Sequence, residues 1–226
     1  AWYDRTEGVK TWTRGHITTA EGVEVVRWAK RRGIRVTAEV TPHHLLLGTE
    51  ELVGYDTVYK VNPPLRSAEH IAALRAALID GTIDCVATDH APHARHDKEH
   101  AFPDAAFGML GLETALAVII DLFVDEGTLD WARVAELMSF TPARIADLPG
   151  QGRPIAIGEP ANLVLVDPNR RAVVDRDSSA SLSRNNPWHG RTFHGGVHTT
   201  LLRGRVTHSV DASLVRHDAR ETTHGS

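Results

Sequence analysis

Apolar positions between residues 19 and 150 follow helical and strand-like periods in alternation. Residues 20–32 repeat apolar side chains at helical spacing, after a threonine-rich start and before Gly33, which predicts an amphipathic helix. Residues 34–41 are short, rich in β-branched side chains and followed by a proline, which predicts a strand. This alternation is typical of βα units around a parallel sheet.

The same alternation continues along the chain. Ser67 is placed to start a second helix that ends at Gly81, and residues 83–88 are an apolar strand. Further helices are predicted over residues 109–125, 130–138 and 142–147. We therefore expect an α/β domain over residues 1–152.

The pattern changes after Gly152 to short strands separated by turns. Strands are predicted over residues 161–166, 171–174 and 197–206, with no long helix between them. These strands indicate a β-rich appendage over residues 153–210, followed by a loose polar tail over 211–226.

Composition narrows the class of protein. At 226 residues with 42% hydrophobic side chains, the chain can bury a substantial core. Its formal net charge of −4 argues against nucleic acid or an anionic membrane as a partner. Cys85 is the single cysteine, in an apolar run that favours a buried, inert thiol, so no disulfide forms within the chain. Without an apolar run of about 18 residues or a recognisable signal peptide, the expected location is the cytoplasm.

Histidine is unusually frequent, with 14 in the chain. The apolar strand at 83–88 leads directly into Asp89 and His90, and an apolar strand that delivers such residues at its C-terminal end has the geometry of a barrel active site. Asp89 as a simple turn cap is the less favoured alternative. His16 precedes the first helix, where a metal ligand and a side chain that satisfies the helix N-terminus are equally good interpretations.

The other histidines receive structural interpretations. His43 and His44 follow the strand at 34–41, and we favour a loop-packing or supporting role over metal ligation. His96 and His100 stand among charged residues, so the segment 95–100 is interpreted as a solvated loop face.

Several motifs together resemble a known family. They are HITT at 16–19, NPPLR at 62–66, TDHAPH at 88–93 and FGMLGLETAL at 107–116. The chain resembles the bacterial type of dihydroorotase, in the amidohydrolase superfamily, from about residue 15 to 207, as the C-terminal two-thirds of such an enzyme. The resemblance implies part of a TIM-type (β/α) amidohydrolase barrel with a small C-terminal β-rich sandwich portion.

The resemblance also implies roles for single residues. In the family the histidine of the HITT-like motif binds metal and the TDHAPH aspartate follows 73 residues later, as Asp89 follows His16 here (89 − 16). His16 and Asp89 therefore inherit metal-ligand roles, and Asp89 is also the catalytic proton carrier. Asn62 and His93 are implied to contact substrate, and the backbone of Phe107 and Gly108 to touch its ring.

The implied reaction is the reversible, zinc-dependent conversion of (S)-dihydroorotate into N-carbamoyl-L-aspartate, a step of pyrimidine biosynthesis. One or two Zn²⁺ ions suit this chemistry, because bound zinc lowers the pKa of water and polarises a carbonyl. The family's HxHxR motif, a bridging carboxylate or carboxylated lysine, and another metal histidine do not occur in the 226 residues. We therefore expect the chain to be truncated and inactive alone.

Partners and competing functions follow from the same resemblance. It implies a small-molecule substrate, and either a homodimer or an association with aspartate transcarbamoylase. Dihydropyrimidinases, hydantoinases and allantoinases would share His16 and Asp89, but they generally lack a histidine at the position of His93. A non-catalytic dihydroorotase-like subunit would have lost metal residues, whereas His16 and Asp89 are both present. A histidine-rich metal buffer would show clustered ligands without βα units.

Overall fold

The structure is a computed structural model that describes residues 2–3 and 12–211 of the chain. The tail predicted over residues 211–226 therefore lies outside the described residues, apart from Asp211.

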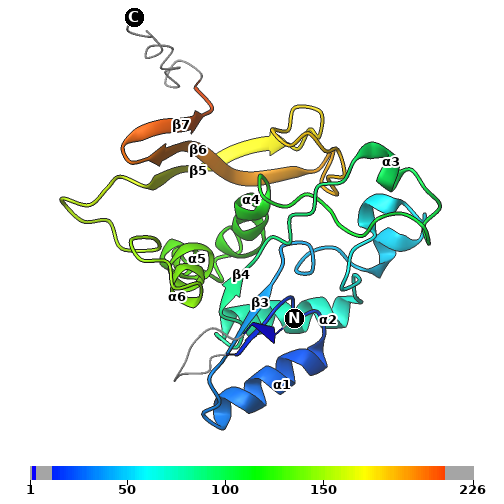
Figure 1. Ribbon diagram of the computed structural model, residues 1–226, viewed down its shortest axis with the longest axis horizontal. Coiled ribbons are helices and arrows are strands. Elements are labelled where there is room, and N and C mark those ends of the chain that lie inside the picture. The colour runs from blue at the N-terminus through cyan, green and yellow to red at the C-terminus, as the bar shows by residue number, and fades with distance from the viewer. Residues whose placement is uncertain (1, 4–11, 212–226) are drawn as a thin grey trace, which may run out of the picture.

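A small sheet runs through the middle of the α/β part (Figure 1). Its strand order is β1-β2-β3-β4, with β2, β3 and β4 parallel and β1 antiparallel to β2. The strands are β1 (Trp2–Tyr3), β2 (Trp12–Arg14), β3 (Val36–Val40) and β4 (Cys85–Val86). The strands predicted over 34–41 and 83–88 are confirmed, although both are shorter than predicted.

Helices cover this sheet and fill the segments between its strands. The longer ones are α1 (Ala20–Arg31) and α2 (Ala68–Ile79), as the spacing of apolar residues predicts. The remaining helices are η1 (Thr49–Leu52), η2 (Thr57–Tyr59), α3 (Arg95–Lys98), α4 (Ala115–Ile119), α5 (Trp131–Ala135) and α6 (Thr141–Ile145), with π-helical turns η3 (Ile120–Val124) and η4 (Glu136–Phe140).

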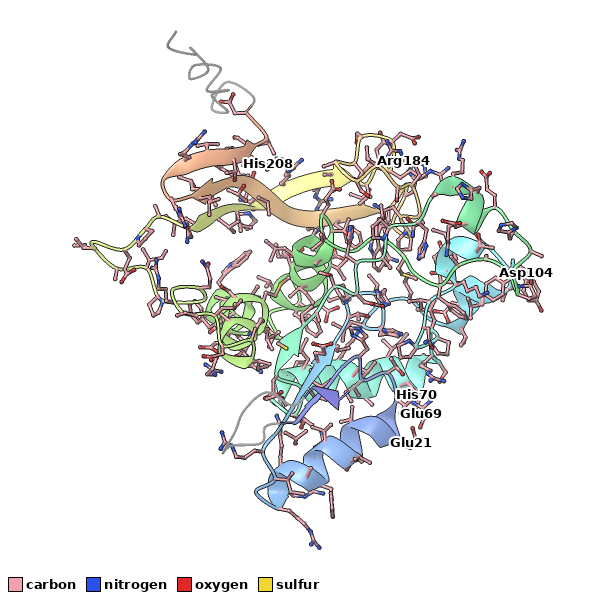
Figure 2. The ribbon with its side chains drawn as sticks, viewed as in Figure 1. Glu21, Glu69, His70, Asp104, Arg184 and His208 are labelled. Atoms are coloured by element: carbon pink, nitrogen blue, oxygen red, sulfur yellow. The ribbon has the colours of Figure 1, made fainter. Side chains whose placement is uncertain are left out.

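Helices α1 and α2 lie side by side, and their N-terminal regions are joined. The Thr19 hydroxyl caps α1 by accepting a hydrogen bond from the Gly22 amide at 3.1 Å. The Ala20 amide donates to Nδ1 of His70, which belongs to α2 (3.1 Å). Figure 2 shows His70 beside Glu21 at this junction. A histidine from α2 thus satisfies an amide that helix geometry leaves without an internal partner.

The helix predicted over 109–125 begins six residues later than expected, at Ala115. Its would-be first turn is held in another conformation, because Nδ1 of His90 accepts hydrogen bonds from the amides of Gly111 and Leu112 at 3.1 and 3.3 Å. The Leu110 amide donates to the carbonyl of Asn185 (3.0 Å). Apolar periodicity cannot reveal this start, since distant polar groups determine it.

The C-terminal part is a three-stranded antiparallel sheet in the order β5-β6-β7, which lies above α4 in Figure 1. Its strands are β5 (Leu163–Val173), β6 (Thr192–Leu202) and β7 (Arg205–Ser209). The predicted change to strands is confirmed, but the strands expected at 161–166 and 171–174 are one strand with register shifts. Trp188 and Phe193 join this part to the main core, being 1% and 2% exposed.

No helix in the described ranges 2–3 and 12–211 has the length and apolar character that crossing a membrane requires.

Candidate active site

His16 and Asp89 lie at the same edge of the parallel sheet. His16 follows β2 and Asp89 follows β4, on either side of β3. Each connection is fixed to β3 by a backbone hydrogen bond, from Ile17 N to Glu39 O at 2.9 Å and from Ala87 N to Val40 O at 3.0 Å. Because both residues follow the C-terminal ends of parallel strands, their side chains can meet above β3.

The two side chains do converge. Nε2 of His16 lies 3.5 Å from Oδ1 of Asp89, and both side chains are about a quarter exposed (26% and 28%). Zinc bonds to nitrogen and oxygen are each about 2 Å long, so two ligands of one ion lie about this far apart. The metal-ligand roles that the resemblance implies for His16 and Asp89 require this convergence.

Both residues also have an uncommon backbone conformation. The φ angle is 49° at His16 and 46° at Asp89, in the left-handed region that side chains other than glycine rarely adopt. Such strain persists where surrounding structure enforces it, and it concentrates at functional sites. The fold thus holds both residues in a backbone conformation of higher energy, and this conformation sets the direction of their side chains.

Glu39 completes this cluster from β3, the central strand. Its Oε1 lies 3.1 Å from Nδ1 of His16. Nδ1 is buried and makes no hydrogen bond of good geometry within the described part of the chain, so this is a close ionic contact. We did not predict Glu39; the available signal was a carboxylate inside an apolar, β-branched strand.

The electrostatics of the cluster favour a cation. The hydrogen bond with Asp89 raises the pKa of His16, burial opposes that shift, and the charges of Asp89 and Glu39 reinforce it. Two carboxylates therefore surround one imidazole. His16, through Nε2, and Asp89 are suitable zinc ligands in type and separation, so these residues fit a metal ion.

A second group of predicted residues meets at the loop before α4. Nε2 of His93 donates to the carbonyl of Phe107 at 2.7 Å. A Cβ atom on Gly108 would lie 2.5 Å from Cβ of Ala91 and 3.0 Å from His93 Nε2, and the φ angle of Gly108 is 133°. Glycine is therefore required there for both space and backbone conformation.

Two buried lysines hold this loop in place. Nζ of Lys60 donates to the carbonyls of Pro103 and Ala105, each at 2.7 Å. Nζ of Lys98 donates to the carbonyls of Ala106 at 2.8 Å and Gly108 at 3.1 Å. Lys60 and Lys98 are only 6% and 8% exposed.

Lys98 corrects one prediction. The segment 95–100 was interpreted as solvated, and His96 and His100 are exposed, but Lys98 points inward. Burial, followed by the charge of Lys60, lowers the pKa of Lys98 to about 8. Nothing in the local polar sequence distinguishes this lysine from its neighbours.

Asn185 ties the loop to the C-terminal part. Its side-chain amide donates to the carbonyls of Ala91 at 2.9 Å and Gly108 at 3.1 Å. Its backbone carbonyl accepts from Leu110, as described above. Sequence reasoning assigned no role to this residue, whereas the structure makes it a support of the loop.

Asn62 reaches this region less directly. Its side chain is exposed, two residues after Lys60, whose carbonyl accepts a hydrogen bond from the Gly108 amide at 2.9 Å. The structure thus brings His93, Phe107 and Gly108 into direct contact, and it places the Asn62 segment beside them through Lys60.

His43 and His44 are both buried behind the site, at 2% and 1% exposure. His44 contacts the Thr41 hydroxyl through Nδ1 at 2.7 Å and the Pro63 carbonyl through Nε2 at 2.9 Å, and burial lowers its pKa to about 4. The predicted loop-packing role of His44 is confirmed. Nε2 of His43 is buried without a hydrogen bond in the described part, and burial lowers the pKa of His43 well below its usual value.

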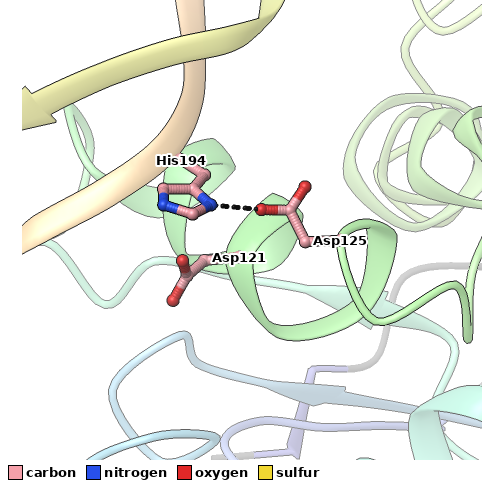
Figure 3. A group of neighbouring side chains, drawn as sticks. All are labelled: Asp121, Asp125 and His194. Carbon is pink, nitrogen blue, oxygen red and sulfur yellow. Dashed lines mark hydrogen bonds and ion pairs between the residues drawn. The ribbon is translucent and has the colours of Figure 1, made fainter.

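Another cluster of potential ligands lies elsewhere. Asp121, Asp125 and His194 place ligand atoms within 4.8 Å of one another (Figure 3). Nδ1 of His194 contacts Oδ2 of Asp125 at 2.8 Å, and this contact joins β6 to the C-terminal end of η3. We interpret this partly exposed group as an ion pair between two parts of the fold. A cavity of about 460 Å³ between α1 and α2 likewise contains none of the site residues.

Comparison with known sequences identifies the family of the chain. Residues 6–207 match the amidohydrolase family. A dihydroorotase of Streptomyces coelicolor is 59% identical over 199 residues, which are 88% of this chain and 46% of that protein. A dihydroorotase of Mycobacterium tuberculosis is 54% identical over 192 residues, which are 85% of this chain and 45% of that protein. The chain thus spans about half the length of these relatives, whereas the expected share was two-thirds.

Solved structures give the same picture of the fold. An L-hydantoinase from Arthrobacter aurescens superposes with a TM-score of 0.81 at 32% identity, over 87% of this chain and 44% of that one. A D-hydantoinase from Thermus sp. also superposes with a TM-score of 0.81, at 27% identity, over 88% of this chain and 45% of that one. The chain therefore belongs to the amidohydrolase family.

Proposed function

We propose that this chain is the part of a dihydroorotase that supplies the metal ligands His16 and Asp89 and the substrate loop. The convergence of Nε2 of His16 and Oδ1 of Asp89 at 3.5 Å is the observation that carries the proposal. The proposal is also supported by the sequence identity of this chain to two proteins named dihydroorotase, which is 59% and 54%. In this proposal the four-stranded sheet is part of a TIM-type barrel, and β5 to β7 are part of a sandwich.

The reaction assigns distinct proton steps to Asp89. Water adds to the carbonyl carbon of the cyclic amide, the ring C–N bond breaks, and the products are a carboxylate, a carbamoyl NH₂ group and one proton released to solvent. Asp89 accepts the proton that the attacking water loses and delivers it to the leaving nitrogen. His16 and Asp89 would hold the zinc ion, which would lower the pKa of water and polarise the amide carbonyl.

The loop supplies recognition. His93 and Asn62 bind the anionic or polar groups of dihydroorotate, and the backbone around Phe107 and Gly108 contacts its ring. His93 separates this proposal from a hydantoinase or dihydropyrimidinase function, whose substrates carry no carboxylate at that place. The network of Lys60, Lys98 and Asn185 fixes the loop that presents these groups.

Ligand number sets a condition on activity. A catalytic zinc ion takes about three protein ligands plus water, and the site residues assigned here to the metal are His16 and Asp89. We propose that the 226-residue chain alone binds zinc weakly and does not turn over, and that further ligands complete the site. We propose that the protein acts in the cytoplasm. We also propose that it forms a homodimer or a complex with aspartate transcarbamoylase.

The test compares this chain alone with the same chain joined to the part of the Streptomyces coelicolor relative that it does not match. We expect zinc-dependent ring opening of dihydroorotate only in the joined protein. In it, Asp89→Asn should lower kcat by about 10²–10⁴-fold, and His93→Ala should mainly raise KM.

His96→Ala is the matched control for His93→Ala, because His96 lies in the same loop with 83% of its side chain exposed. Turnover by the joined protein with hydantoin or dihydrouracil but not with dihydroorotate would overturn the substrate assignment. Turnover of about 1 s⁻¹ or more by the 226-residue chain alone would overturn the ligand-number argument.

A further inference from the structure

Glu39 contacts His16 from the neighbouring strand of the sheet. It lies on β3, between the strands that deliver His16 and Asp89. Its backbone carbonyl accepts the amide of Ile17, the residue after His16, at 2.9 Å. The backbone and the carboxylate of Glu39 therefore both contact the His16 segment.

The residue before His16 leaves room for this contact. A Cβ atom on Gly15 would lie 3.3 Å from Oε1 of Glu39, which is tighter than an ordinary van der Waals contact. Glycine at this position lets the carboxylate approach to 3.1 Å from Nδ1 of His16. The other ring nitrogen, Nε2, faces Asp89.

We propose that Glu39 is a positioning residue that keeps the proton of His16 on Nδ1 and presents Nε2 to the metal. This inference rests on the proposed function for the identity of the metal site. It does not rest on the substrate.

General metal-site chemistry explains why a carboxylate is needed there. A histidine that binds metal through one ring nitrogen donates the N–H of the other to a carboxylate, carbonyl or water, which fixes its tautomer and orientation and raises its basicity. In the described part of the chain, Nδ1 of His16 makes no hydrogen bond of good geometry, and the Glu39 carboxylate is in ionic contact with it at 3.1 Å, so a small rotation of either side chain would bring the N–H onto this acceptor.

The experiment measures zinc affinity of the 226-residue chain and its variants by competition with a chelator, while ¹⁵N NMR follows the His16 ring. Wild type should carry the proton on Nδ1 and bind zinc through Nε2. Glu39→Gln should weaken zinc binding by about 10–100-fold. Glu39→Asp keeps the charge on a shorter side chain, and its affinity should lie between the two.

Glu24→Gln is the matched control, since Glu24 is a carboxylate on α1 with 60% of its side chain exposed. The inference would be overturned if the zinc affinity of Glu39→Gln lies within twofold of the wild-type value. It would also be overturned if His16 has the same tautomer in Glu39→Gln as in wild type. If Glu39→Gln does not fold, Glu39→Asp decides in the same way.

The two proposals fail separately. In one outcome, the joined protein binds zinc at His16 in a way that depends on Glu39 but leaves dihydroorotate intact. This outcome would overturn the proposed function and support the role of Glu39. Dihydroorotate turnover in the joined protein, with zinc affinity indifferent to Glu39→Gln, would do the reverse.

Discussion

The two ends of the candidate site are built in opposite ways. At the metal end, two carboxylates surround His16, and Nδ1 of this histidine is buried without a hydrogen bond. At the loop end, Lys60, Lys98 and Asn185 donate to one backbone carbonyl after another. The metal end presents Nε2 of His16 and the Asp89 carboxylate to a ligand, whereas the loop end uses its side chains to fix the backbone.

The metal end is built for ligand binding, whereas the loop end is built for folding stability. The metal end concentrates negative charge and strained backbone, so its groups gain most when a cation arrives. The loop end satisfies carbonyls that burial would otherwise make costly. We therefore expect substitutions at the metal end to affect zinc binding and turnover, and substitutions at the loop end to affect folding first.

The largest expected effect on stability is from Lys98→Met. This change keeps an apolar stem but removes the donor to the Ala106 carbonyl and one of the two donors to the Gly108 carbonyl, which keeps the hydrogen bond from Asn185. A buried carbonyl left without a partner costs about 1–3 kcal/mol, and a lost hydrogen bond costs about 0.5–1.5 kcal/mol. We expect the free energy of unfolding, measured by urea denaturation, to fall by about 3 kcal/mol. Arg95→Met is the control, on the same short helix with 75% of its side chain exposed.

The contrast with the metal end is part of this prediction. Asp89→Asn in the zinc-free chain should change the free energy of unfolding by less than about 1 kcal/mol, since the partly exposed Asp89–His16 contact contributes little. A loss at Asp89 equal to the loss at Lys98 would remove the distinction between the two ends.

A smaller effect is expected from Gly108→Ala. The new Cβ would lie 2.5 Å from Cβ of Ala91, at a φ angle that alanine rarely adopts, so we expect a loss of about 2 kcal/mol. Gly127→Ala separates the two causes, because Gly127 also has a positive φ (70°) but no atom within 4 Å of its added Cβ. Equal losses in the two variants, by urea denaturation, would show that the close packing of Gly108 is unimportant.

The same two ends differ in how far the sequence predicts them. His16 and Asp89 could be identified and paired because each follows a strand and their spacing matches a family. The late start of α4 could not, since His90 and Asn185 capture its backbone amides through contacts that are distant in sequence. Lys98 was misjudged for the same reason. A charged side chain in a polar segment is normally exposed, and only the folded loop supplies carbonyls that stabilise it inside.

The smallest predicted effect is a pH dependence that belongs to the loop end alone. Burial, with the charge of Lys60 beside it and Asp56 partly compensating, lowers the pKa of Lys98 from its usual 10.5 to about 8 in the folded chain. Below pH 8 the folded and unfolded chains both hold the proton, so the cost of burying the charge is fully present. Between pH 8 and about 10.4 the unfolded chain keeps a proton that the folded chain has released, so stability rises with pH.

We expect a gain of about 1 kcal/mol in the free energy of unfolding between pH 7 and pH 9 from this group. The measurement is urea denaturation at both pH values for wild type and Lys98→Met, because the difference between the two proteins cancels groups that titrate alike in both. The neutral amine still donates two hydrogen bonds, so Ala106 and Gly108 keep their partner as the charge is lost. An identical pH dependence in the two proteins would show that Lys98 is not the titrating group. It would also show that burying the Lys98 charge does not lower the stability of the loop end.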